Sequence, residues 1–69
     1  MNDREERLAE AVRAACLSAA REAYEDAGLR GLCAEGRWEA ATGAIASCDL
    51  SVAIRADDAA PGAPRGPYR

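Results

Sequence analysis

The chain of 69 residues contains no His, no Lys and no Phe, and its only aromatic side chains are one Trp and two Tyr. Without His and Lys, it lacks two of the side chains that most often act as general bases or nucleophiles. Its Ser and Thr hydroxyls stand beside no base in a recognisable motif. The carboxylate pair Glu22 and Asp26 falls on a helical face that we expect to be solvated. We therefore predict no catalytic residue, no cofactor and a non-enzymatic role.

Cysteine is also sparse, and Cys16, Cys33 and Cys48 stand too far apart to form a C-x-x-C pair. A structural zinc site needs four nitrogen or sulfur ligands at short spacings, so we predict no metal site within one chain. We expect three small buried hydrophobes, one in each predicted helix. A metal shared between subunits and a reactive thiol are the alternatives. The absence of a disulfide framework favours a reducing cytoplasm.

Positive charge is scarce and scattered along the chain. The net charge is −3, and the segment 3–26 carries seven acids against four Arg. Nucleic-acid-binding proteins usually present a basic stripe, so nucleic acid is disfavoured as a partner. No apolar run approaches the roughly 20 residues of a membrane span, and the acidic start lacks the basic-then-apolar layout of a signal peptide. We expect a soluble, cytoplasmic protein without membrane contact.

Bulky apolar residues are few, because 18 of the 69 residues are Ala. Burying a large apolar side chain contributes roughly 1.5–3 kcal/mol, whereas ordering each residue costs about 1.5 kcal/mol. A core this small roughly breaks even for one copy of the chain. We predict that another protein surface stabilises it, either a second copy in a homo-oligomer or a larger partner.

The residues that are present predict an all-α fold with a long N-terminal helix. Asn2 followed by Glu5 forms a capping box ahead of a segment free of Gly and Pro, so we predict a helix that runs to Ala27 and is ended by Gly28. Its apolar residues cover about half of the circumference, which is more than one neighbouring helix can cover. The predicted interaction face on this helix consists of Leu8, Val12, Leu17 and Tyr24.

A tight corner is predicted around Gly36. The sequence favours a short helix or single turn over 29–35 and a third helix over 37–48. Trp38 is expected to fill the wedge between the helix ends, so that its replacement by Ala would unfold the chain. Gly43 marks either a close helix crossing or a tolerated defect. The predicted structural core is Cys16, Leu32, Trp38, Ala41, Ile45 and Cys48.

The helical periodicity stops after Cys48. Leu50, Val52 and Ile54 alternate with small or polar residues, a spacing typical of an extended strand. We therefore expect a short extended segment within 49–56 that lies on the helices, with a plain tether as the alternative.

The end of the chain has a different composition. Residues 57–69 contain three Pro and two Gly, which predicts a disordered segment. We accordingly divide the chain into a helical domain at 1–54 and a disordered tail at 55–69. Tyr68 and the arginines beside it form either a solvated end or a small docking motif.

Residues 32–50 resemble the turn and second helix of a tetratricopeptide repeat, on the pattern of Gly36, Trp38, Ala41 and Ile45. The first helix lacks the Leu-Gly pair of that family. No second copy of the unit occurs, whereas a solenoid needs about three. The resemblance therefore implies a helix corner and not a peptide-binding groove.

Residues 21–41 also resemble short, Ala-rich, uncharacterised bacterial proteins, some of which bear an acetyltransferase label. An acyl-CoA-dependent transferase needs a mixed sheet and a pyrophosphate-binding loop. Gly28, Gly31 and Gly36 do not form such a loop, because no strand precedes them. The resemblance supports a bacterial protein more than it supports that activity.

Three functions are compatible with these residues. The favoured one is a helical interaction module or accessory subunit, which buries the Ala-rich face of its first helix against itself or a larger partner. The second is a helix-turn-helix DNA-binding regulator, for which Arg37 is the only groove-reading candidate on the third helix. The third is an acyltransferase-related polypeptide.

Overall fold

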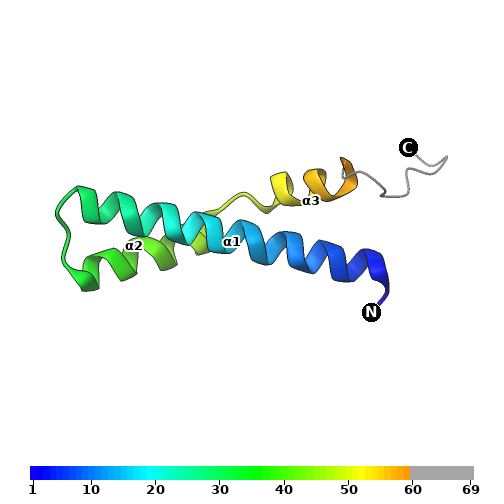
Figure 1. The fold of residues 1–69 in the computed structure, drawn as a ribbon, viewed down its shortest axis with the longest axis horizontal. Coiled ribbons are helices and arrows are strands. Elements are labelled where there is room, and N and C mark those ends of the chain that lie inside the picture. The colour runs from blue at the N-terminus through cyan, green and yellow to red at the C-terminus, as the bar shows by residue number, and fades with distance from the viewer. Residues whose placement is uncertain (60–69) are drawn as a thin grey trace.

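A computed structural model describes residues 1–59 of the chain. Within this range it contains three helices and no strand (Figure 1). The helices are α1 (Asp3–Leu29), α2 (Ala34–Ser47) and α3 (Leu50–Ala59). The prediction of an all-α fold, in which a long first helix packs against the others, is confirmed.

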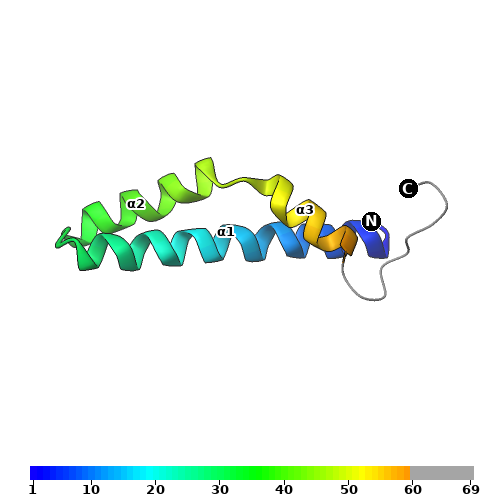
Figure 2. The ribbon, with the colours of Figure 1, turned by 90° about the horizontal axis from the view of Figure 1, so that it is seen from above.

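The helices form two layers, with α1 as one layer and α2 followed by α3 as the other (Figure 2). At 1.5 Å per residue, α1 is about 40 Å long, and α2 and α3 together are about 36 Å long. The second layer therefore follows nearly the whole of α1 in the opposite direction. Both shorter helices pack on α1 and, within the described residues, not on one another. We call residues 17–47 the hairpin end and residues 3–16 with 48–59 the α3 end.

The start of α1 is fixed by the predicted capping box. The Asn2 side chain accepts a hydrogen bond from the backbone N–H of Glu5 at 2.8 Å, and the backbone N–H of Asn2 donates to the Glu5 carboxylate at 3.0 Å. Asp3, Glu5 and Glu6 place negative charge in the first turn, where the helix dipole favours it.

The end of α1 corrects the prediction that Gly28 stops the helix. The helix runs on to Leu29, and the chain turns at Gly31, whose φ of 88° lies in the left-handed region. The backbone N–H of Gly31 donates to the carbonyl of Gly28, and that of Leu32 donates to the carbonyl of Ala27. These two bonds form a Schellman motif, which needs its glycine after the last helical turn and not within it.

The predicted helix or turn over 29–35 is also wrong, because the Schellman turn leaves only a short connection at 30–33. α2 begins at Ala34, three residues earlier than predicted, and contains Gly36 in its first turn. A Cβ at Gly43 would meet nothing within 4 Å, so no close helix crossing occurs there. Gly43 is a tolerated defect in α2, which was the alternative.

The extended segment predicted over 49–56 is a helix instead. The Asp49 carboxylate accepts hydrogen bonds from the backbone N–H of Ser51 at 3.0 Å and from its hydroxyl at 2.6 Å. An Asp that binds the N–H two residues ahead is a strong N-cap. The alternation was misleading because Leu50 and Ile54 also stand four apart, which is helical spacing. α3 reaches Ala59, so it includes the first residues assigned to the tail. The remaining part of the predicted tail, 60–69, lies outside the described residues.

The seam between the layers buries only alanines, namely Ala27, Ala41 and Ala53. Their methyl groups allow the helices to approach closely but remove little apolar area from water. No large side chain among the described residues is fully buried. Two single-helix layers cover one another along one stripe, so bulky side chains beside that stripe remain open to water. The part of one copy that the structure describes has a packed seam but no enclosed core.

Candidate interaction face

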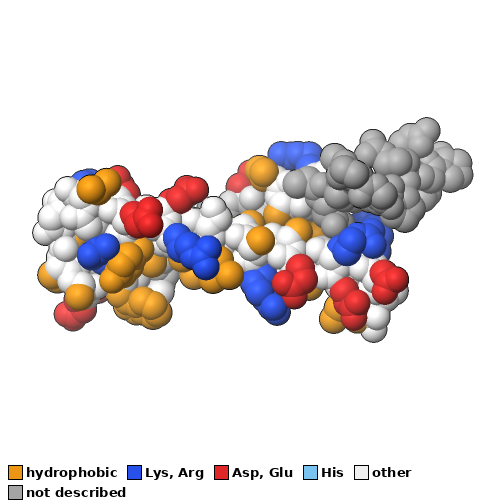
Figure 3. Space-filling view, in the orientation of Figure 1, with side chains coloured by type: hydrophobic (Ala, Val, Ile, Leu, Met, Phe, Trp, Pro, Cys, Tyr) orange, Lys and Arg blue, Asp and Glu red, His pale blue; other side chains and the backbone are white. Residues whose placement is uncertain are grey.

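A groove of about 240 Å³ lies beside the seam at the hairpin end. It is lined by Ala20, Arg21, Tyr24, Glu25, Trp38 and Ala41, and we call it the Trp38 groove. Figure 3 shows apolar side chains gathered over α2 and the adjoining part of α1. Pockets for small molecules usually measure about 300–1,000 Å³. The Trp38 groove is smaller and open, so it suits side chains of another protein better than a cofactor.

Trp38 lines this groove and is not a core residue, which corrects the prediction. Its side chain is 65% exposed. Because α2 begins at Ala34, Trp38 already lies within a formed helix and not at the corner between two helix ends. The seam position is taken by Ala41, three residues later, and the indole lies beside it. An indole this exposed leaves a large apolar area in water.

Of the other predicted core residues at the hairpin end, the small one is buried and the large ones are exposed. Ala41 is buried, as predicted, whereas Leu32 and Ile45 are exposed. Leu32 covers the first turn of α2, where its side chain lies 3.2 Å from the position that a Cβ on Gly36 would take. The sequence identified the correct helix faces, but only the small residue on them reaches the seam.

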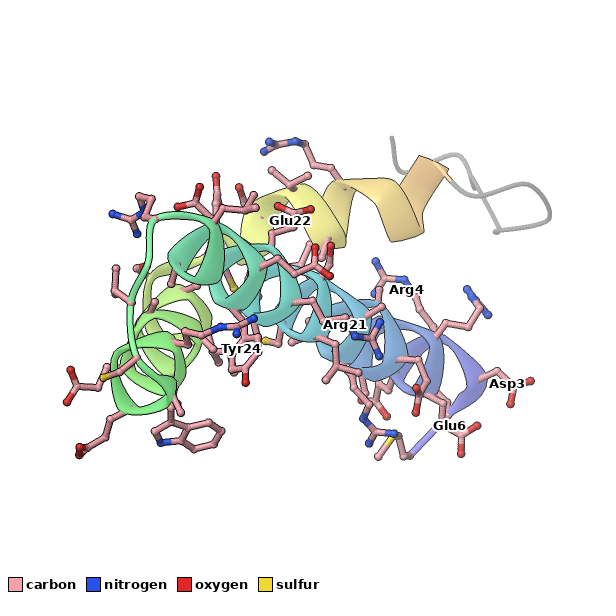
Figure 4. The ribbon with its side chains drawn as sticks, turned by 60° about the vertical axis from the view of Figure 1, so that its left-hand side comes forward. Asp3, Arg4, Glu6, Arg21, Glu22 and Tyr24 are labelled. Carbon is pink, nitrogen blue, oxygen red and sulfur yellow. The ribbon has the colours of Figure 1, made fainter. Side chains whose placement is uncertain are left out.

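The predicted interaction residues lie along α1 with unequal exposure. Leu8 and Val12 are half-buried in the part of α1 along which α3 packs. Leu17 and Tyr24 are exposed at the hairpin end, and Leu17 retains 46% of its accessible surface. Figure 4 shows Tyr24 and Arg21 on one side of α1, with Glu22 pointing away from them. The open part of the predicted face is therefore its C-terminal half.

A contact between Arg37 and Tyr24 joins α2 to α1 beside the groove. The Arg37 guanidinium lies 4.1 Å from the centre of the Tyr24 ring, and its Nε donates to the Tyr24 carbonyl at 3.2 Å. Gly28 leaves room for this side chain, because a Cβ there would stand 2.7 Å from Arg37 Cζ. No pattern in the sequence predicts this pairing between residues 13 positions apart. The contact with Tyr24 occupies Arg37, which is the only basic side chain of α2. A helix that reads the major groove of DNA would have to present this side chain to the bases.

Two of the three cysteines meet between the two layers. Cys16 and Cys48 are half-buried, which agrees in part with their predicted place in the core. Cys33 is exposed, so the prediction that it is buried is wrong. Cys48 lies at the end of α2, and its thiol donates to the Ile45 carbonyl at 3.5 Å. Burial and then the hydrogen-bonded neighbouring thiol of Cys16 raise the pKa of Cys48 above its ordinary value. A raised pKa keeps this thiol protonated and unreactive.

No group of three or more Cys, Asp or Glu side chains within residues 1–59 is arranged to hold a metal ion. None of the described helices combines the length and the apolar character that crossing a membrane requires. The chain matches no protein family, no curated protein and no solved structure closely enough to inform its function. The exposed apolar face of the hairpin end is therefore the candidate site.

Proposed function

We propose that this protein is a small, non-catalytic helical interaction module whose hairpin end docks against another protein surface. One observation carries the proposal: the described residues bury three alanines, while Leu17, Tyr24, Trp38 and Ile45 stay open on neighbouring faces of α1 and α2. Trp and Tyr are enriched at the centre of protein interfaces.

The energetics of a single copy support the same conclusion. A buried Ala contributes far less than the roughly 1.5–3 kcal/mol of a larger apolar side chain, and the ion pairs Arg13–Glu10 and Arg30–Asp26 both lie on the surface. Exposed pairs of this kind contribute about 0–1 kcal/mol each. Covering the Trp38 groove would add the burial that the seam lacks. We place this module in a reducing, cytoplasmic compartment, because its three cysteines are free.

Unfolding at high dilution tests the proposal. When the chain is heated at nanomolar concentration, we expect its helical circular dichroism to be lost gradually and at low temperature. At that dilution no other protein covers the Trp38 groove. Cooperative unfolding at high temperature under the same conditions would show a self-sufficient monomer and contradict the proposal. The matched control is the Gly43→Ala variant, which adds helix propensity at a position with open space around it and leaves the groove intact.

A further inference from the structure

We propose that the occupant of the Trp38 groove is a second copy of this chain, docked antiparallel so that two hairpins form a four-helix assembly. This inference rests on the proposed function and names its partner. Two charged residues, Arg21 and Glu25, lie in the lining of the groove.

Arg21 and Glu25 stand four residues apart on α1 and flank Tyr24. Within residues 1–59 the structure gives neither side chain an ion-pair or hydrogen-bond partner. The order in which Arg precedes Glu is also the weaker one for pairing within a helix. The groove therefore carries one positive and one negative group that are both available to an approaching surface.

These two charges make the groove self-complementary. When two copies of α1 meet antiparallel about a two-fold axis level with Ala23, midway between residues 21 and 25, Arg21 of each copy faces Glu25 of the other. A two-fold interface uses the same patch on both subunits, so a single pair of residues is satisfied twice. A parallel arrangement would instead place Arg21 against Arg21 and Glu25 against Glu25. The charges thus favour the antiparallel arrangement.

The same axis brings the apolar parts of the two grooves together. Trp38 and Tyr24 line one groove, so both lie close to the axis and each indole meets the groove of the other copy. The overlap covers the hairpin ends, about 20 Å along the helices and about 20 Å across two of them. A patch of that size falls at the low end of specific interfaces, below about 1,200 Å² in total. We therefore expect a dimer that dissociates in the micromolar range.

Sedimentation equilibrium of the full chain from about 1 to 300 µM tests this inference. We expect a mass that rises with concentration from 7.2 kDa toward twice that value. Trp38→Gln should weaken the dimer at least about 30-fold, as the loss of a central aromatic anchor does. Leu29→Gln is the matched control, because Leu29 is 88% exposed and does not line the groove. Equal weakening by both variants would overturn the assignment of the groove.

Charge exchange tests the antiparallel arrangement. Arg21→Glu and Glu25→Arg should each weaken the dimer about tenfold, because each turns two attractive pairs into repulsive ones. The double variant should recover the original affinity, and an equimolar mixture of the two single variants should form a heterodimer. A double variant as weak as the single ones would overturn the arrangement.

The possible failures can be told apart. A chain that stays monomeric at 300 µM and unfolds gradually would overturn the second copy as occupant while leaving an interaction module that needs a different protein. A chain that stays monomeric and unfolds cooperatively at high temperature would overturn both proposals.

Discussion

Different contacts hold α2 against α1 at the hairpin end and α3 against α1 at the α3 end. At the hairpin end, the Schellman turn at Gly31 and the Arg37–Tyr24 contact position α2. At the α3 end, Ala53 is buried and the chain enters α3 through the Asp49 cap after the half-buried Cys48. The hairpin end has the better defined join and also the more exposed aromatic surface. The comparison indicates that the end with the firmer scaffold is the one that presents the proposed interaction face.

Replacing a buried alanine with leucine at each end should reveal the largest difference in stability between the hairpin end and the α3 end. Ala27→Leu should destabilise the fold by about 1–3 kcal/mol, because a fully buried methyl position next to the turn has no room for a larger side chain. Ala53→Leu should cost less, since α3 is a short helix that can shift along α1. Urea unfolding followed by circular dichroism at a fixed protein concentration measures both. Equal losses would show that the two ends are equally rigid.

A pair of substitutions sharpens the account of the join at the hairpin end. Arg37→Ala should destabilise the fold by about 1 kcal/mol, because it removes a cation–π contact and a hydrogen bond to the Tyr24 carbonyl. Gly28→Ala should have little net effect alone, because the helix propensity it adds is offset by displacement of the guanidinium.

In the Arg37→Ala background, Gly28→Ala should instead stabilise the fold by about 1 kcal/mol, because the obstructing side chain is gone. A double-mutant cycle measured by urea unfolding compares the two backgrounds. An effect of Gly28→Ala that does not depend on Arg37 would show that the two residues are not coupled.

The α3 end should respond to acid through Asp49. Hydrogen bonds from the Ser51 hydroxyl and then from the Ser51 backbone N–H lower the pKa of Asp49 below its ordinary value. A lowered folded-state pKa means that the carboxylate stabilises α3 above the unfolded-state pKa, and that this contribution is lost as the pH falls through the folded-state pKa.

Far-UV circular dichroism between pH 5 and pH 2.5 should therefore show a loss of helix in the natural chain. Asp49→Asn keeps a capping oxygen but cannot titrate, so that part of the loss should be absent in this variant. Identical acid profiles for the two proteins would show that the Asp49 cap does not control α3.

Thiol reactivity should give the smallest effect and report on the same end. Cys33 is exposed and should react with a maleimide first, while Cys48 lags because its raised pKa leaves little thiolate at pH 8. Removing the neighbouring thiol by Cys16→Ala should speed the alkylation of Cys48. Mass spectrometry of timed samples identifies each modified cysteine. If Cys48 reacts as fast as Cys33, then Cys48 is not half-buried beside Cys16 between the two layers.

The sequence predicted what depends on local patterns and missed what depends on contacts between layers. The all-α class and the Asn2–Glu5 capping box follow from short-range rules and are confirmed. The end of α1 was misplaced because two glycines stand three apart and only backbone geometry shows that Gly31 takes the positive φ. The helix at Leu50 was missed because five residues of alternating character also fit a helical spacing.

The candidate site was predicted in part, for a physical reason. The excess of alanine and the wide apolar arc on α1 predicted a face that one copy does not cover. Leu17 and Tyr24 of that face are exposed, whereas Leu8 and Val12 are half-buried. Trp38 was assigned to the core because it was expected to fill the wedge at a corner between two helix ends. Which of Trp38 and Ala41 occupies the seam depends on where α2 starts, and the sequence misplaced that start by three residues.

Acrylamide quenching of Trp38 tests the central claim most directly, because the only Trp of the chain lies in the proposed interface. At nanomolar concentration the indole should be quenched almost as readily as free tryptophan, since it is 65% exposed in one copy. At several hundred micromolar it should be shielded, and Arg21→Glu should restore the quenching. Trp38 that is equally accessible at every concentration would contradict the account of a face that requires a second copy to cover it.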